Sequence, residues 1–408
     1  MSDTVILILY LAALMACGLL LTRFLSLLKL PNVTAYLIAG LILSPFSFGI
    51  ISEEVITKLS FLSTLALGFI AFSIGFCFKL DHLKELGSKI YTITIVQALS
   101  TALIVDLAML ALHFIAPDKI ALAEVFVLGA IATATAPAAT LLVVKQYKAK
   151  GTVTDTLLPV VAIDDAVGLI IFSISFSISK VLANGTALTF SSTVLSPLRE
   201  IGLSLLIGAA IGFALSFATR FFRSRANRVT LIIICVFLGV GISEWLDLSS
   251  LLLCMMIGAI YCNAVKETDR VMEVYDRWTH PLYVIFFVLS GAELNVRMIL
   301  SVGIVGIVYF AFRSLGKYFG ARVGATLAHA EPNVKKYLGI TLLPQAGVAI
   351  GMSAVVMSAM PEFGASIRTV VLCATLVYEL IGPLLTKLAL TKAGEIQTAP
   401  KKTESPSN

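Results

Sequence analysis

The stretch VVAIDDAVGLI, from Val160 to Ile170, places two adjacent aspartates, Asp164 and Asp165, inside an otherwise apolar run. A charge at the centre of a membrane-spanning helix costs about 2.5–3.5 kcal/mol even on the insertion scale, so such residues usually face a cavity or a partner. Neighbouring helix positions point about 100° apart, so one aspartate can meet a fixed partner while the other faces a pathway. The pair therefore predicts an ion or proton site. A purely structural role for both acids is the alternative, although one buried acid would suffice for it.

The rest of the chain has the composition of a polytopic membrane protein. Of its 408 residues, 58% are hydrophobic and 13% charged, and the mean hydropathy is +0.98, whereas soluble domains have about 25% charged residues. A spanning helix needs about 20 apolar residues. Thirteen candidate segments predict an all-α fold of about 13 transmembrane helices. The segments are Val5–Leu27, Val33–Ile50, Leu59–Phe78, Ile90–Ile115, Ala121–Val144, Thr154–Ser179, Leu195–Phe221, Val229–Trp245, Leu248–Ala264, Pro281–Val296, Ile299–Ala328, Tyr337–Met357 and Ile367–Leu390.

Basic residues in the loops predict the orientation, because cytoplasmic loops carry an excess of Lys and Arg. With the N-terminus outside and the C-terminus in the cytoplasm, the inside segments hold 22 of the 30 basic residues and the outside loops hold 6. We therefore expect an integral protein of a bacterial cytoplasmic (inner) membrane. The net charge of +6 then reflects topology, and no nucleic-acid partner is expected. The polar tail 391–408 is expected to be a disordered cytoplasmic segment.

The remaining two basic residues, Arg313 and Lys317, lie within a predicted span, in FRSLGKYFGARVG. They are four residues apart and share a helix face, and Gly316 and Gly320 form a small-xxx-small pair that allows close helix approach. A desolvated Lys can lose its proton, whereas Arg effectively never does. Lys317 is therefore the better candidate for proton chemistry, and Arg313 for a fixed structural or snorkelling role.

Two predicted spans contain interruptions. In IATATAPAATLL, Pro137 removes a backbone donor beside the hydroxyls of Thr133 and Thr135, and LLPQAGVAIGMS carries Pro344 and Gln345. Interrupted spans in corresponding positions of two halves point to a transporter site near the bilayer midplane, where unwound carbonyls can coordinate a cation. For each break alone, an ordinary proline kink is the alternative.

Other polar groups within the spans are less informative. Asp106 lies mid-span, where a pathway or pH-sensing role and a buried hydrogen bond are both open, and Glu379 in YELIGP is expected to anchor core packing. The six cysteines form no CxxC pair, so neither a disulfide framework nor a metal site is predicted, and no cofactor is expected.

These motifs, in this order, resemble the monovalent cation:proton antiporter superfamily. Within this superfamily the chain resembles the paired-aspartate, electrogenic branch. The relatives it resembles are the sodium/hydrogen exchanger family and Kef-type membrane domains. It implies an inverted-repeat sodium/proton antiporter fold with two discontinuous crossed helices, a transmembrane antiporter domain over residues 1–390 and a homodimer. The core would comprise about 90–179 and 299–390, and the dimerisation scaffold about 5–78 and 195–296. The segments that carry the resemblance are LPNVTAYLIAGLILSP, IATATAPAATLLVVKQYKAKG, VVAIDDAVGLI, RSLGKYFGA, LLPQAGVAIGMS and YELIGPLLTKLAL.

The resemblance also implies roles for individual residues. Asp165 would be the principal carrier of cation and proton, and Asp164 would pair with Lys317. Thr133 and Thr135 match the family's unwound segment, so the monovalent cation would be bound by Asp165 and Asp164 with help from these threonines. Relatives often have a serine directly before the proline of this segment, where this chain has an alanine.

The expected function is secondary antiport of a monovalent cation for protons, electrogenic because the paired-aspartate form implies more than one proton per cation. Na⁺ is the first choice, since a compact carboxylate and hydroxyl site favours a small hard cation. The alternatives are a K⁺/H⁺ antiporter or potassium efflux protein of the same family, a cation channel, or a sodium-coupled symporter. No enzyme is expected, because no sizeable polar loop bears catalytic groups. The expected partners are the cation, the proton, membrane lipid and a second copy of the chain.

Overall fold

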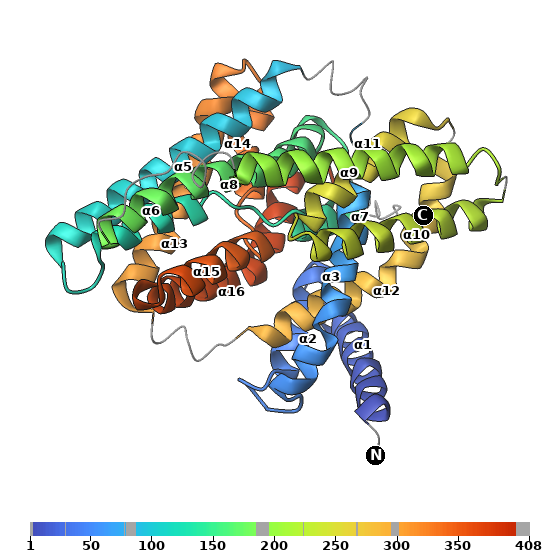
Figure 1. The fold of residues 1–408 in the computed structure, drawn as a ribbon, viewed down its shortest axis with the longest axis horizontal. Helices are drawn as coiled ribbons and strands as arrows, with labels where there is room; N and C mark the ends of the chain where they lie inside the picture. The colour runs from blue at the N-terminus through green and yellow to red at the C-terminus, as the bar shows by residue number, and fades with distance from the viewer. Residues whose placement is uncertain are drawn as a thin grey trace, which may run out of the picture.

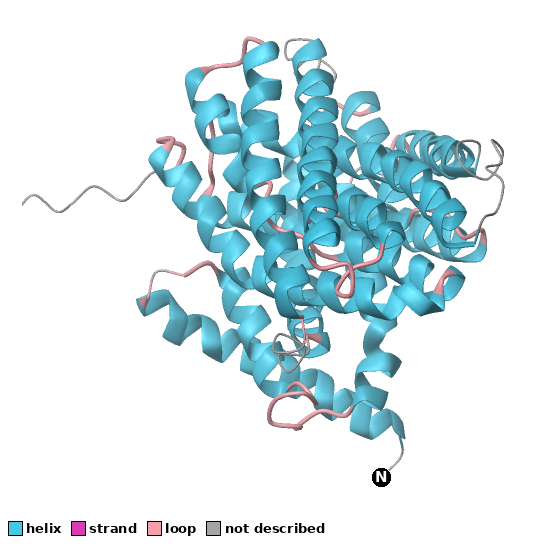
Figure 2. Cartoon of the chain, turned by 90° about the vertical axis from the view of Figure 1, so that its left-hand side faces the viewer, coloured by secondary structure: helices cyan, strands magenta, loops and turns pink. Residues whose placement is uncertain are grey.

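A computed structural model describes residues 3–28, 30–76, 78, 87–184, 196–222, 224–266, 268–294 and 302–396. In these residues all regular structure is α-helical, as Figure 2 shows. The helices are α1 (Asp3–Leu27), α2 (Asn32–Leu43), α3 (Glu53–Phe76), α5 (Ser88–Ile115), α6 (Leu122–Ile131), α7 (Pro137–Tyr147), α8 (Thr152–Asn184), α9 (Ser196–Ala218), α10 (Arg225–Trp245), α11 (Ser250–Ala264), α12 (Asp269–Glu293), α13 (Gly303–Leu327), α14 (Pro332–Thr341), α15 (Gly347–Ala359) and α16 (Pro361–Lys392).

Several of these helices are suited to crossing a membrane. Within the described residues, seven are long and apolar enough by length and composition, namely α1, α3, α5, α8, α9, α10 and α16. The two interrupted segments are each divided into a pair of shorter helices, α6 with α7 and α14 with α15. Pro137 is the first residue of α7, where the fixed φ and the missing N–H of proline suit a helix start. The total of thirteen spans stays a prediction.

The largest difference from the predicted segments is in α12, which begins at Asp269 rather than at Pro281. Its first turns are amphipathic, because Val271 and Tyr275 are buried while Arg277 is exposed. A charged amphipathic turn has low mean hydropathy and is missed by a search for uniformly apolar runs.

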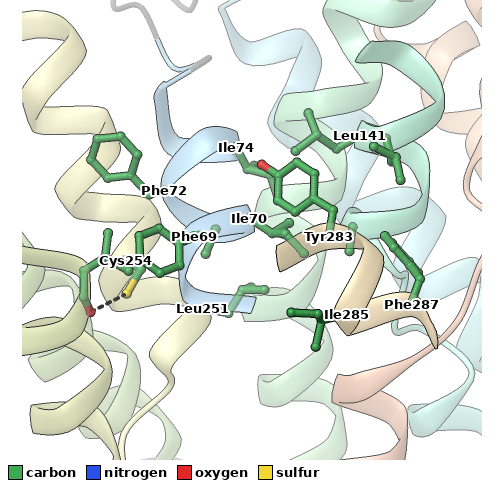
Figure 3. Close-up of a cluster of buried hydrophobic side chains, with 14 of the residues drawn as sticks. Phe69, Ile70, Phe72, Ile74, Leu141, Leu251, Cys254, Tyr283, Ile285 and Phe287 are labelled. Atoms are coloured by element: carbon green, nitrogen blue, oxygen red, sulfur yellow. Dashed lines mark hydrogen bonds between the residues drawn. The ribbon is translucent and has the colours of Figure 1, made fainter. Parts of the chain in front are cut away.

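The helices gather into two groups, visible as the two sides of Figure 1. One group contains α5, α6, α8 and α13 to α16, whose buried side chains form two apolar clusters. The other contains α1 to α3 and α9 to α12, which share one larger cluster. Helix α7, which follows the first chain break, contributes side chains to that larger cluster. Figure 3 shows Leu141 of α7 among side chains of α3 and α12. The two groups therefore pack against each other through α7, and also where α16 meets α2.

Helix α13 packs unusually close to α5 along a row of glycines. A Cβ atom added to Gly316 would lie 2.9 Å from the Cα of Thr101, and one added to Gly320 would lie 3.0 Å from the carbonyl oxygen of Gln97. Only glycine permits this approach, as the small-xxx-small pattern predicts. The contact brings Lys317 against the middle of α5.

Residues after α16 anchor the start of α8. The Glu395 side chain is 7% exposed and accepts hydrogen bonds from the backbone N–H groups of Val153 (2.7 Å) and Thr154 (2.8 Å) and from the Thr154 hydroxyl (2.7 Å). A carboxylate here satisfies donors that a helix N-terminus leaves unpaired and interacts favourably with the helix dipole. In the predicted disordered tail, Thr391 and Lys392 thus belong to α16 and Glu395 is buried, while residues 397–408 lie outside the described residues.

Candidate ion-binding site

Asp164 is a fully buried carboxylate near the middle of α8. Its Oδ2 accepts hydrogen bonds from the Thr135 hydroxyl (2.5 Å) and from the Lys317 ammonium (2.8 Å). Its Oδ1 accepts a hydrogen bond from the side-chain amide of Gln97 on α5. A carboxylate offers about four lone-pair positions, so Asp164 already has three of them occupied by protein donors.

Lys317 is equally buried, on the face of α13 that meets α5. Besides Asp164, its ammonium donates to the Thr135 hydroxyl oxygen (2.8 Å), to Oε1 of Gln97 (3.2 Å) and to the backbone carbonyl of Thr133. Four acceptors thus surround a group that has three N–H donors. A buried ion pair is tolerated when its remaining hydrogen-bonding groups are also satisfied, and this pair meets that condition.

Asp165 is in a different situation, although it is the next residue. It is 1% exposed, and within the described residues neither of its carboxyl oxygens has a hydrogen-bond partner. A buried carboxylate without partners is strongly unfavourable as a bare anion. A proton or a cation on Asp165 would remove this penalty, which singles out Asp165 as the group that can bind an exchangeable species.

The two chain breaks lie against each other beside these charges. The backbone N–H of Ala136, directly before α7, donates to the carbonyl of Pro344 in the second break (2.8 Å). Thr133 and Thr135 belong to the first break, between α6 and α7. Gln345, in the second break, donates to the carbonyl of Ile131 at the end of α6 (3.1 Å). The breaks therefore form one connected region of non-helical backbone.

Arg313 neutralises the carbonyl ends of both broken helices. Its fully buried guanidinium donates to the carbonyls of Ala132 (3.1 Å), Ala134 (2.7 Å) and Leu343 (2.8 Å) and lies 4.3 Å from the ring centroid of Tyr378. A cation is favourable at helix C-termini, where carbonyls lack partners. Of the two roles expected for Arg313, the structural one applies, since a buried guanidinium cannot snorkel.

The predicted site residues are thus brought together unequally. Asp164, Lys317, Thr133 and Thr135 contact one another directly, and Asp165 follows Asp164 on α8. The breaks place Pro137, Pro344 and Gln345 next to this cluster.

Two predicted accessory residues lie apart from the cluster. Asp106 is half-buried on α5 against Gly129 of α6, and its Oδ1 has no partner within the described residues. Glu379 is buried on α16. Among the described contacts, no hydrogen bond or ion pair connects either acid with Asp164, Asp165 or Lys317.

Sequence reasoning missed Gln97, which contacts both members of the ion pair. Its signal was an amide in the middle of the apolar run TITIVQALSTALIV. A neutral amide is a weaker signal than a charge, because it is less costly to place in a membrane helix.

Comparison with known proteins agrees with this architecture. A family model described as the transmembrane sodium/hydrogen exchanger matches residues 10–392. A solved structure of the sodium proton antiporter MjNhaP1 from Methanocaldococcus jannaschii at pH 8 has a TM-score of 0.73 at 17% identity, covering 97% of this chain and 99% of that one. An electron-microscopy structure of the same antiporter has a TM-score of 0.73 at 18% identity, covering 97% and 96%. No curated protein matches the sequence.

Proposed function

The chain belongs to the family of transmembrane sodium/hydrogen exchangers, and from this membership we propose that it exchanges Na⁺ for protons with Asp165 as their shared carrier. The family consists of secondary transporters, so the chain is a cation/proton antiporter of the membrane and not an enzyme. The observation that carries the choice of Asp165 is its buried carboxyl group, whose two oxygens have no hydrogen-bond partner among the described residues.

Exchange follows from competition for this carboxylate. In a low-dielectric environment Asp165 needs a positive partner, and a proton and a dehydrated monovalent cation satisfy that need alternately. The coordination of the cation can be completed by other oxygens of the same cluster, namely those of Asp164, of Thr135 and of the non-helical backbone at the chain breaks. Binding of a cation therefore expels a proton, and binding of a proton expels the cation.

Electrogenic exchange is part of the proposal. Asp164 and Asp165 are adjacent acids, and Lys317 balances only one of them. When a cation draws Asp164 away from Lys317, the lysine loses its counter-charge and can release a proton in addition to the one from Asp165. This assigns the chain to the paired-aspartate branch, in which more than one proton moves per cation.

Transport also requires the site to face each side in turn. We assign residues of about 90–179 and 299–390 to a moving core and about 5–78 and 195–296 to a scaffold, which the separate buried clusters of the two helix groups support. The core then rocks against the scaffold around the fixed site. A homodimer through the scaffold completes the proposal.

Na⁺ is preferred over K⁺ because the site offers carboxylate and hydroxyl oxygens in a tightly packed cluster, and small hard cations suit such oxygens. A K⁺/H⁺ antiporter of the same family is the alternative, since coordination by flexible backbone carbonyls relaxes size selection.

The test is cation-driven proton movement in proteoliposomes. A pH-sensitive dye inside acid-loaded vesicles should dequench on addition of NaCl, more weakly with KCl, and the response should change when the membrane potential is clamped. Asp165→Asn removes the charge at nearly constant volume and should abolish the response to every cation. Asp155→Asn, at the exposed start of the same helix, is the matched control and should exchange normally.

Each outcome decides one element of the proposal. A response only to KCl would favour the potassium antiporter, and a rate independent of the clamped potential would refute electrogenic exchange. Robust exchange by folded Asp165→Asn protein would refute Asp165 as the carrier, and cation flux without proton movement would favour a channel.

A further inference from the structure

Gln97 connects the two members of the buried ion pair. Its side-chain N–H donates to Oδ1 of Asp164, and its Oε1 accepts from the Lys317 ammonium at 3.2 Å. The side chain is fully buried in the α5–α13 contact. The amide has only one favourable orientation here, because flipping it would place its oxygen against the carboxylate and its N–H₂ group against the ammonium.

The Gln97 amide satisfies hydrogen-bonding groups of both Asp164 and Lys317. With Gln97 present, Asp164 receives three hydrogen bonds and the Lys317 ammonium has four acceptors for three donors. Neither charge therefore needs Asp165, and the two oxygens of Asp165 have no partner in the part of the chain that the structure describes. Without Gln97, Asp164 would lose its only described Oδ1 donor and Lys317 would lose one acceptor from the α5 side.

Lys317 has a long flexible side chain, so its position depends on the groups around the ammonium. An ammonium that is held less firmly by Gln97 and Asp164 can turn toward the neighbouring carboxylate, Asp165. There it would occupy the place of the substrate cation, because both are monovalent cations that bind carboxylate oxygens.

We infer that Gln97 is a positioning residue that confines Lys317 and Asp164 to each other and thereby keeps Asp165 available for the substrate cation. This inference rests on the proposed function, in which Asp165 binds the cation. Gln97 should therefore determine the affinity for the cation and should have little influence on the rate of the rocking motion once the cation is bound.

Two substitutions remove the double contact in different ways. Gln97→Met keeps the length of the side chain and removes both hydrogen bonds. Gln97→Asn keeps an amide, and with it the polarity of the site, but is one methylene too short to reach both partners. For each variant the apparent KM for Na⁺ should rise about tenfold or more, since hydrogen bonds to charged groups are of that strength, while kcat should change by less than about twofold.

The conservative variant and the matched control separate positioning from space filling. Gln97→Glu keeps the size and the acceptor that holds Lys317, but it replaces the N–H donor to Asp164 by an acceptor oxygen and adds a negative charge beside that carboxylate. Its KM should therefore rise at least as much as that of Gln97→Met. Thr101→Val lies one turn further along α5 in the same buried contact, and the one hydrogen bond described for the Thr101 hydroxyl goes to the carbonyl of Gln97 in its own helix. This variant should leave KM and kcat unchanged.

Binding is read out separately from transport by the rise in melting temperature that Na⁺ produces in detergent-solubilised protein. The concentration of Na⁺ needed for half of this rise should shift with KM, because a ligand that binds only the folded protein stabilises it. If Gln97→Met does not fold, Gln97→Asn provides the same comparison.

A KM and an Na⁺ stabilisation equal to those of the natural protein, in folded Gln97→Met and Gln97→Asn, would overturn the inference. A Gln97→Glu variant with the KM of the natural protein would overturn it as well. A loss of kcat at constant KM would also overturn it, because the defect would then be in the motion. Absence of exchange by the natural protein with every cation would overturn the proposed function instead, so the two failures are distinguishable.

Discussion

At the scale of single residues, the site separates two neighbouring acids by their surroundings. Asp164 has three donors and an opposite charge within hydrogen-bond distance, whereas Asp165 has no described partner. One helix position, about 100° of rotation, is enough to make this difference. A fixed anion thus lies beside an exchangeable one, which is the arrangement that ion–proton competition requires.

A contact between the paired acids and an internal cation could be predicted from the sequence, because buried charges in an apolar environment require a partner. That Asp164 pairs with Lys317 was implied by the family resemblance. The partners of Arg313 could not be predicted in this way. They are backbone carbonyls of two chain breaks more than 200 residues apart, between Ala132 and Leu343, and no side-chain pattern encodes which carbonyls the folded chain leaves unpaired.

Arg313→Lys should destabilise the protein by about 2–3 kcal/mol, because an ammonium cannot reach three carbonyls in the directions that the guanidinium does. The melting temperature of purified protein should fall by several degrees. Arg322→Lys, an exposed position on the same helix, should leave it unchanged. Equal melting temperatures for Arg313→Lys and the natural protein would show that the breaks are held together without the guanidinium.

At the scale of helices, the end of α7 forms a polar contact between the two groups. Lys145 forms an ion pair with Asp276 of α12 (2.6 Å) and lies 5.7 Å from the ring centroid of Tyr283. The side chain of Gln146 accepts a hydrogen bond from the backbone N–H of Asn32 (2.9 Å). These residues line a cavity of about 250 Å³ between α2, α7 and α12.

The sequence identified α7 through its proline but assigned Asp276 to a loop, because the first turns of α12 are too polar for a uniformly apolar segment. The ion pair was therefore not predictable, although both helices contain clear apolar stretches. Partial exposure of its side chains, 26% and 43%, limits its contribution to about 1 kcal/mol. A contact of that strength can break and re-form if the proposed core moves against the scaffold.

Joining these two helix ends covalently should stop exchange if the core rocks against the scaffold. In a variant without the six native cysteines, Lys145→Cys and Asp276→Cys should be cross-linked by a short bifunctional reagent that forms a disulfide bond with each thiol. Proton movement should cease and should return on reduction. Asn333→Cys with Ala393→Cys, which joins α14 to the end of α16 within one group, should be cross-linked without loss of exchange. Undiminished exchange across a complete Lys145–Asp276 link would refute rocking at this contact.

At the scale of the whole molecule, contacts between helix ends agree with the predicted sides of the membrane. The sequence assigned the ends of several distant segments to the cytoplasm from their Lys and Arg content alone. The described polar contacts among these ends join inside segments to inside segments: Asn32 with Gln146 (2.9 Å), Lys145 with Asp276 (2.6 Å), Lys150 with Glu395 (3.0 Å) and Asn333 with Ala393 (3.3 Å). The fold is thus consistent with one basic face, while its absolute direction depends on the charge rule.

Labelling of single cysteines in intact cells tests that direction. Lys119 and Lys336 are both exposed and belong to segments predicted on opposite sides, outside and inside. In the cysteine-free background, a membrane-impermeant maleimide should label Lys119→Cys in intact cells, and Lys336→Cys only after the membrane is permeabilised, because positively charged segments are retained in the cytoplasm. The reverse pattern would invert the topology and would place the Lys145–Asp276 contact on the outer side. The geometry of the site at Asp165 would be the same, but the face of the protein that lies in the cytoplasm would then be the opposite one.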